Sequence, residues 1–244
     1  MFAGTAGVSR ALRQKGYDVF SFDILQGEAG DLLRPPVLKR IFTLLSSGRC
    51  LGLFAGVECT TFSQANTEGL RSHAHPLGVP GLNARLQQKV DYGNSLLFVA
   101  ARIFRTCRKF KVPFVWENPH SSRMWDTPQA QEIYEWPDTS DVVTDMCAWG
   151  TPWRKRTRFR TWLLPQAADW RVLCRPQGPS KACLFRGVPH VILRGKDAHG
   201  RSLTKRAAEY PPSLCQAIAA AMIDQGFQLS FGAVAKTSHL RVRK

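Results

Sequence analysis

The feature that most constrains the fold is a short apolar run that ends in a polar loop carrying a cysteine. Residues 51–55 have the pattern of a strand buried on both faces, and Gly56 begins a loop that presents Cys59. Open α/β sheets carry their chemistry just beyond the C-terminal ends of strands, which is where Cys59 falls. A lone cysteine is more often a small buried hydrophobic residue than a nucleophile. Its function therefore depends on the residues at the other strand ends.

Strands and helices are predicted to alternate along the chain, which is typical of an α/β doubly wound sheet with helices on both faces. Apolar periodicity predicts helices at 8–15, 35–45, 86–110, 128–136 and 211–225, and strands at 17–23, 50–55, 112–116, 141–145 and 161–164. We divide the chain into a catalytic domain (1–164), a small irregular basic insert (165–205), a C-terminal helix that returns to the domain (206–226) and a basic tail (227–244).

Acidic residues follow two of the predicted strands. The segment Phe2-Ala-Gly-Thr-Ala-Gly7 is a strand end with a glycine-rich turn, and Asp23 ends the next strand. An acid about twenty residues after such a turn commonly holds a ribose, although it can also cap a turn. Asp31 lies in a second turn. Glu117 follows an apolar strand, where a carboxylate without a function is costly.

Positive charge is concentrated in the C-terminal part of the chain. The net charge is +16, and residues 151–244 contain eighteen Lys and Arg against four Asp and Glu. A nucleic acid partner explains this excess better than a solvated basic surface, so we expect phosphate contacts that weaken with salt. No apolar run reaches the roughly 18 residues of a membrane span. We expect a monomer that does not associate with membranes.

The cysteines indicate a reducing compartment. There are seven, at scattered positions and without a CxxC pair, which is not a disulfide framework. No secretory signal is recognisable at the N-terminus. We therefore expect an intracellular protein, nuclear if the source is eukaryotic and otherwise cytoplasmic. Met1 leads directly into Phe-Ala-Gly, which indicates that the start of a first strand is missing from this reading frame.

Five segments resemble, in order, the motifs of the DNA (cytosine-5)-methyltransferases. The segments are Phe2-Ala-Gly-Thr-Ala-Gly7, Cys59-Thr-Thr-Phe-Ser63, Glu117-Asn118, Arg154-Lys-Arg-Thr-Arg158 and Tyr210-Pro-Pro-Ser-Leu214. The family motifs are F-x-G-x-G, P-C-Q-x-F-S, E-N-V, Q-x-R-x-R and P-P-x-L. The resemblance implies a Rossmann-like sheet that binds S-adenosylmethionine, a small target-recognition insert, and transfer of a methyl group to carbon 5 of cytosine in DNA.

The resemblance also implies roles for individual residues. Cys59 would be the nucleophile, Glu117 would grip the base, and Arg156 and Arg158 would brace the site. The cofactor would be held by Phe2, Ala3, Gly4, Thr5, Gly7, Asp23, Ile24, Asp31 and Leu32. The nucleic acid would be held by Ser63, Arg71, Arg154, Lys155, Arg186 and Arg194.

The chemistry accounts for these residue types. Carbon 5 of cytosine is a poor nucleophile until a thiolate adds at carbon 6, which divides one difficult step into easier ones. Glu117 at N3 would stabilise charge on the ring, and nearby arginines would lower the pKa of the thiol. Glu58 stands where the family has proline and should raise that pKa by like-charge repulsion. The base must leave the duplex, and the loop at 60–82 is expected to close over it.

Two other functions stay open, together with a metal hypothesis. The chain could methylate cytosine in RNA with the same residues, or it could be a degenerate domain that binds nucleic acid without catalysis. In the insert, Cys174, Cys183 and His190, with Cys147 as a fourth ligand, could bind zinc. Their spacing fits no standard zinc signature, so ordinary buried side chains are the favoured interpretation and no metal is predicted.

Overall fold

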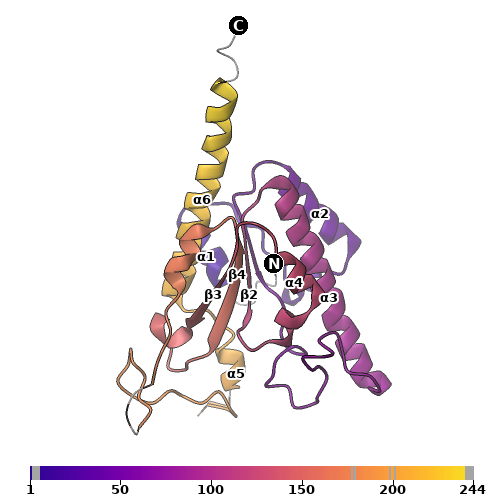
Figure 1. The fold of residues 1–244 in the computed structure, drawn as a ribbon, viewed down its shortest axis with the longest axis vertical. Helices are drawn as coiled ribbons and strands as arrows, with labels where there is room; N and C mark the ends of the chain where they lie inside the picture. Colours follow the sequence, from indigo (N-terminus) through magenta and orange to yellow (C-terminus); the bar gives the residue numbers. More distant parts are fainter. Residues whose placement is uncertain (2–5, 177, 179, 198, 201, 240–244) are drawn as a thin grey trace.

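Four strands form a mixed sheet between two layers of helices (Figure 1). The computed structural model describes residues 1, 6–176, 178, 180–197, 199–200 and 202–239. The strands are β1 (Leu53–Gly56), β2 (Phe114–Pro119), β3 (Thr139–Asp145) and β4 (Arg156–Trp162). Their order in the sheet is β1-β2-β4-β3; β1 and β2 are parallel, whereas β4 is antiparallel to both of its neighbours. The chain is therefore α/β, as predicted.

The helices cover both faces of this sheet. They are α1 (Gly7–Gln14), α2 (Pro35–Ser46), α3 (Ala84–Phe110), α4 (Pro128–Tyr134), α5 (Leu203–Arg206) and α6 (Pro212–His239), and the short 3-10 helices are η1 (Ile24–Gly30), η2 (Arg123–Asp126), η3 (Met146–Trp149) and η4 (Pro165–Trp170). α2, α3 and α4 pack on one face, and α1 and α6 pack on the other (Figure 1). No helix in the described part of the chain is long and apolar enough to cross a membrane.

Local signals begin and end these helices. α2 begins with Pro35, whose fixed φ suits a first helical turn and whose missing N–H is not needed there. α3 begins after Asn83, whose side chain accepts a hydrogen bond from the Leu86 amide at 3.0 Å. α3 ends at Lys111, which adopts a left-handed φ of 55°. The sequence places the start of α3 within two residues of its observed position.

Alternation along the strands creates two separate cores. Phe114 and Trp116 of β2 face α3, where the ring of Phe104 stacks on both at centroid distances of 4.5 and 5.1 Å. Val115 lies between them in sequence and faces the other way, into the core that contains Phe159 and α6. β2 is therefore buried on both faces, as its apolar sequence predicts.

Two sequence-based expectations are corrected. Residues 17–23 form no strand, because their alternating pattern can pair only where a neighbouring strand is present. The segment from 227 is not a loose tail, because α6 continues to His239 and no proline interrupts residues 226–239. Residues 240–244, the most basic end of the expected tail, lie outside the described residues.

A buried ion pair fixes β4 to β3 and gives a first prediction. Arg160 is 1% exposed, donates to both carboxylate oxygens of Asp141 at 2.8 and 2.9 Å, and donates to the carbonyl of Ala130. Arg160→Met leaves Asp141 and the Ala130 carbonyl without their principal donor. Urea denaturation should therefore show a free energy of unfolding that is about 3 kcal/mol lower than that of the native chain. The exposed pair of Arg105 with Glu132 provides the control, and Arg105→Met should cost less than about 1 kcal/mol. Equal losses of unfolding free energy in Arg160→Met and Arg105→Met would contradict a stabilising role for the buried pair.

Candidate active site

A cavity of about 270 Å³ opens at the C-terminal ends of β1 and β2. Because these two strands are parallel and Gly56 pairs with Glu117, their carboxyl ends meet at one edge of the sheet. The loop after β1 contributes Cys59, and the end of β2 contributes Glu117. The other lining residues that carry charge or a hydroxyl are Asp23, Asp31, Glu58, Thr60, Tyr92, Lys155 and Tyr210.

Cys59 occupies a tight turn directly after β1. Its carbonyl accepts hydrogen bonds from the amides of Phe62 and Ser63 at 3.0 and 2.8 Å, which fixes the backbone of the loop. The pKa of the Cys59 thiol is raised to about 11, chiefly by burial and also by the nearby carboxyls of Glu117 and Glu58, whereas Lys155 acts to lower it. The thiol is therefore protonated at neutral pH. Glu58 raises the pKa of Cys59, as the sequence predicts.

Glu117 is a buried acid with one free oxygen. The hydroxyl of Tyr210 donates to its Oε2 at 2.7 Å. Its Oε1 has no hydrogen-bond partner among the described residues, although it is buried beside the cavity. Burial raises the pKa of Glu117, against the opposing effects of Lys155 and the Tyr210 hydrogen bond. An unpaired buried polar atom at a cavity is suited to a ligand that donates a hydrogen bond or shares a proton.

Asn118 connects the two sides of the site. Its Nδ2 donates to the carbonyl of Val57 at 2.7 Å, and the whole side chain is buried. This bond holds the start of the Cys59 loop against the end of β2, so Asn118 is a positioning residue. The sequence identifies it only as part of a motif and assigns it no role.

The positive charge in the cavity comes from Lys155 rather than from the predicted arginines. Arg156 donates to both oxygens of Asp145 at 2.9 Å, and Arg158 pairs with Asp141 at 3.2 Å. Neither is among the residues that line the cavity. Lys155 lines it, with Nζ 5.8 Å from the centre of the Tyr210 ring and a positive φ of 24°. A non-glycine residue in this backbone region is rare, and such strain is found at functional sites.

The predicted cofactor residues fall into three groups. Asp23, Ile24, Asp31 and Leu32 line the cavity; Gly7 packs against Cys215 instead, and Phe2, Ala3, Gly4 and Thr5 lie outside the described residues. Gly30 brings the two acids together, because a Cβ at this position would lie 1.9 Å from the carbonyl oxygen of Asp23. Both acids also accept local amide bonds, from Leu25 and Leu33, at 2.9 Å.

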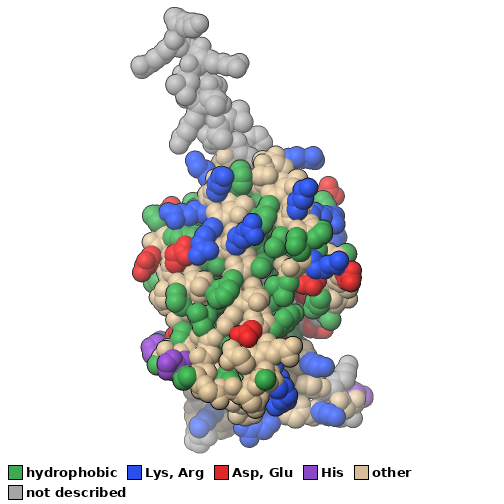
Figure 2. Space-filling model, turned by 90° about the vertical axis from the view of Figure 1, so that its right-hand side faces the viewer, with side chains coloured by type: hydrophobic (Ala, Val, Ile, Leu, Met, Phe, Trp, Pro, Cys, Tyr) green, Lys and Arg blue, Asp and Glu red, His purple; other side chains and the backbone are tan. Residues whose placement is uncertain are grey.

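The predicted nucleic acid contacts are dispersed. Lys155 lines the cavity, Arg154 is 3.6 Å from Asp145, and Arg186 and Arg194 lie exposed on the insert. Ser63 accepts a hydrogen bond from the Ala65 amide within its own turn. On the face that Figure 2 shows, Lys and Arg side chains are scattered among hydrophobic ones.

Arg71 lines a second cavity together with Ser63, and its side chain also has structural contacts. Its guanidinium donates to Asn94 at 2.7 Å and to Thr61 at 3.0 Å, and it lies 3.7 Å from the centre of the Phe62 ring. Burial lowers its pKa to about 10. Arg71 therefore holds the loop after Cys59 against α3.

Comparison with known proteins gives no relative for this chain. No family model matches it, no curated protein matches it, and no solved structure matches it. The function is therefore argued from the geometry of the cavity.

The buried carboxyl gives a prediction for stability. The pKa of Glu117 is higher in the folded chain than in the unfolded chain, so ionisation of Glu117 lowers the free energy of unfolding. This loss is absent in acid, where Glu117 is protonated in both states, and is complete once the pH exceeds the folded-state pKa. Glu117→Gln removes that cost and can still accept from Tyr210. Its melting temperature should exceed that of the native chain by roughly 2–4 °C at pH 8, with the gain shrinking towards about pH 4.

Glu132→Gln is the matched control for this measurement. Its hydrogen bond with Arg105 lowers the pKa of the exposed Glu132, so the substitution should bring no gain in melting temperature as the pH rises. A Glu117→Gln variant that melts below the native chain at pH 8 would refute the assignment of a strained, buried acid.

Proposed function

We propose that this chain transfers a methyl group from S-adenosylmethionine to carbon 5 of cytosine in DNA. The observation that carries the proposal is that Cys59, Glu117 and the acids Asp23 and Asp31 line one cavity, although they are far apart in the sequence. These are the nucleophile, the base-binding acid and the cofactor-binding acids that the resemblance implies. Their convergence in a folded chain is an observation separate from the order of the motifs.

The chain's own groups supply the covalent steps. The Cys59 thiolate adds to carbon 6 of cytosine, which places the displaced electron pair on the ring and makes carbon 5 nucleophilic. Glu117, whose raised pKa favours the protonated form, shares its proton with N3 and so offsets the negative charge that develops there. Its free Oε1 is the atom suited to this bond. After methyl transfer, water takes the proton from carbon 5, the electron pair of that C–H bond re-forms the double bond between carbons 5 and 6, and the bond from carbon 6 to sulfur breaks to release the Cys59 thiolate.

The cofactor would lie beside the paired acids. S-adenosylmethionine supplies an electrophilic methyl group when it is bound. Asp23 and Asp31 offer carboxylates for the ribose hydroxyls and the adenine, and Ile24 and Leu32 offer apolar contacts from the same side of the cavity. The positive charge of the sulfonium suits a cavity whose lining contains four acids and one lysine.

Nucleic acid binding would come from the basic C-terminal part of the chain, residues 151–244. Residues 151–244 carry fourteen of the sixteen net positive charges, and a cytosine can reach a cavity of this kind only after leaving the base stack. DNA is the proposed substrate. Methylation of RNA is the alternative, and a comparison of duplex DNA with transfer RNA as methyl acceptors distinguishes the two.

A domain that binds nucleic acid without catalysis is the second candidate function. The raised pKa of Cys59 favours it, because a protonated thiol is a poor nucleophile.

A mechanism-based trap tests the nucleophile. Fluorine at carbon 5 cannot leave as a cation, so a 5-fluorocytosine oligonucleotide with S-adenosylmethionine should form a complex that survives denaturation. Because the thiolate fraction grows with pH below the pKa, trapping should accelerate about tenfold per pH unit between about pH 7 and 9. Glu58→Gln should accelerate it at every pH, since Glu58 raises the pKa of Cys59. Denaturing electrophoresis measures the rate.

The trap has a matched pair of controls. Cys59→Ser should abolish it while leaving salt-dependent DNA binding unchanged, and Cys50→Ser, at a half-buried cysteine away from the cavity, should trap as the native chain does. A denaturation-resistant complex in Cys59→Ser would refute the assignment.

A substitution at Asp23 tests the cofactor site. Asp23→Asn keeps an acceptor for the Leu25 amide but removes the charge, so titration calorimetry should show S-adenosylmethionine affinity reduced roughly 10- to 100-fold, the scale of charged hydrogen bonds. Asp18→Asn, at an exposed acid outside the cavity lining, should leave the affinity unchanged. Equal affinities for both variants would exclude Asp23 from the site.

A further inference from the structure

The insert between η4 and α6 has little hydrophobic core of its own. Several of its largest apolar side chains face solvent; Phe185 is 42% exposed and Ile192 is 78% exposed. Cys174 and Cys183 form a small buried cluster with Cys147, separate from the two cores that flank the sheet, whereas Leu193 packs against the core around α6. A segment of this kind needs another source of stability, such as a bound metal.

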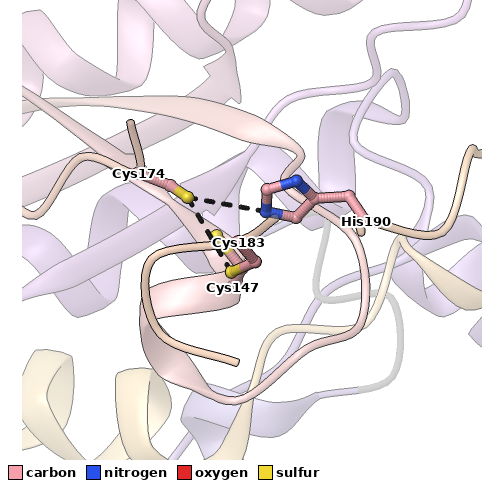
Figure 3. Close-up of side chains that lie close together, drawn as sticks. All are labelled: Cys147, Cys174, Cys183 and His190. Carbon is pink, nitrogen blue, oxygen red and sulfur yellow. Dashed lines mark hydrogen bonds between the residues drawn. The ribbon is translucent and has the colours of Figure 1, made fainter. Parts of the chain in front are cut away.

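Three cysteines and a histidine converge at this point. One ligand atom from each of Cys147, Cys174, Cys183 and His190 lies within 4.8 Å of all the others (Figure 3). The Sγ atoms of Cys174 and Cys183 are 3.8 Å apart, and Cys174 Sγ is 3.6 Å from His190 Nε2. In a regular tetrahedron, Zn–S bonds of about 2.3 Å and a Zn–N bond of about 2.0 Å give S–S and S–N separations of about 3.8 and 3.5 Å.

The backbone around the cluster is arranged to hold it. Cys183 and His190 flank a tight turn that the bridge between Ala182 and Pro189 closes. The Leu184 amide donates to Cys174 Sγ at 3.4 Å, which fixes the position of this sulfur. Beneath the cluster, the buried carboxylate of Asp145 accepts the Cys174 amide at 2.8 Å. Such supporting bonds orient the ligands of metal sites.

We propose that Cys147, Cys174, Cys183 and His190 bind one zinc ion as a closed structural site. Three thiolates and an imidazole suit zinc, and four protein ligands leave no open position for catalysis. The Sγ atoms of Cys174 and Cys183 are 3.8 Å apart, too far for a disulfide, whose S–S bond is about 2.04 Å. The cluster suits a single ion, because the four ligand atoms all lie within 4.8 Å of one another.

The zinc site ties the insert to the sheet. Cys147 lies in η3, directly after β3, whereas the other three ligands come from the insert itself. The sequence favoured ordinary buried side chains at these positions, because the ligands are spread over 147–190 without a standard spacing. This inference does not depend on the proposed methyl transfer.

Metal analysis of untagged protein, purified under reducing conditions, tests the site. We expect about one equivalent of zinc, and about one equivalent of cobalt after exchange, with the thiolate charge-transfer absorption of tetrahedral cobalt. Cys183→Ser should lose the metal, whereas Cys50→Ser should retain it. Less than about a tenth of an equivalent of zinc, both as purified and after zinc is added, would overturn the proposal, as would iron with acid-labile sulfide.

A second measurement on the native chain covers the case in which Cys183→Ser fails to fold. Removal of zinc by a chelator should make residues 171–202 sensitive to limited proteolysis while the flanking α/β core stays resistant, and added zinc should restore resistance. Protection that is the same with and without the chelator would contradict a structural zinc site.

Discussion

The parallel pairing of β1 with β2 is the constraint on which the site depends. It sets Gly56 opposite Glu117, so the loop that carries Cys59 and the buried acid emerge at the same edge of the sheet. The hydrogen bond from Asn118 to the Val57 carbonyl then fixes the distance between the two chain segments. β4 and β3 lie on the other side of β2, and the turn before β4 brings Lys155 to the cavity. A change in the register of β1 would separate Cys59 from Glu117.

The cavity is electrostatically unfavourable for the folded chain. Burial raises the pKa of Cys59 and of Glu117, and Lys155 offsets this only in part. One oxygen of Glu117 is buried without a partner among the described residues. A buried carboxyl of this kind reduces stability at neutral pH, and such groups persist where function requires them. Both features are compatible with the proposed roles, because a protonated acid can share its proton with a ring nitrogen and the thiolate fraction of Cys59 grows as the pH rises.

Local signals made much of the fold predictable, whereas long-range contacts did not. Pro35 and the apolar stripe of α3 predicted two helices, and the apolar run of β2 predicted a strand buried on both faces. The pattern at 17–23 predicted a strand that does not form, because no neighbour pairs with it. Cys59 and Glu117 were predictable because strand ends converge in α/β sheets. That Lys155 rather than Arg156 reaches the cavity depends on a positive φ, which the sequence does not specify. The four converging ligands of the insert also depend on tertiary structure.

The position of the methyl group on the product tests the central claim most directly. Duplex DNA is incubated with the chain and isotopically labelled S-adenosylmethionine, digested to nucleosides, and analysed by mass spectrometry. The account predicts label in 5-methyldeoxycytidine, lost in Cys59→Ser and retained in Cys50→Ser. Label on the exocyclic nitrogen of cytosine or adenine, or label that persists in Cys59→Ser, would contradict it, because transfer to those atoms needs no covalent adduct with Cys59.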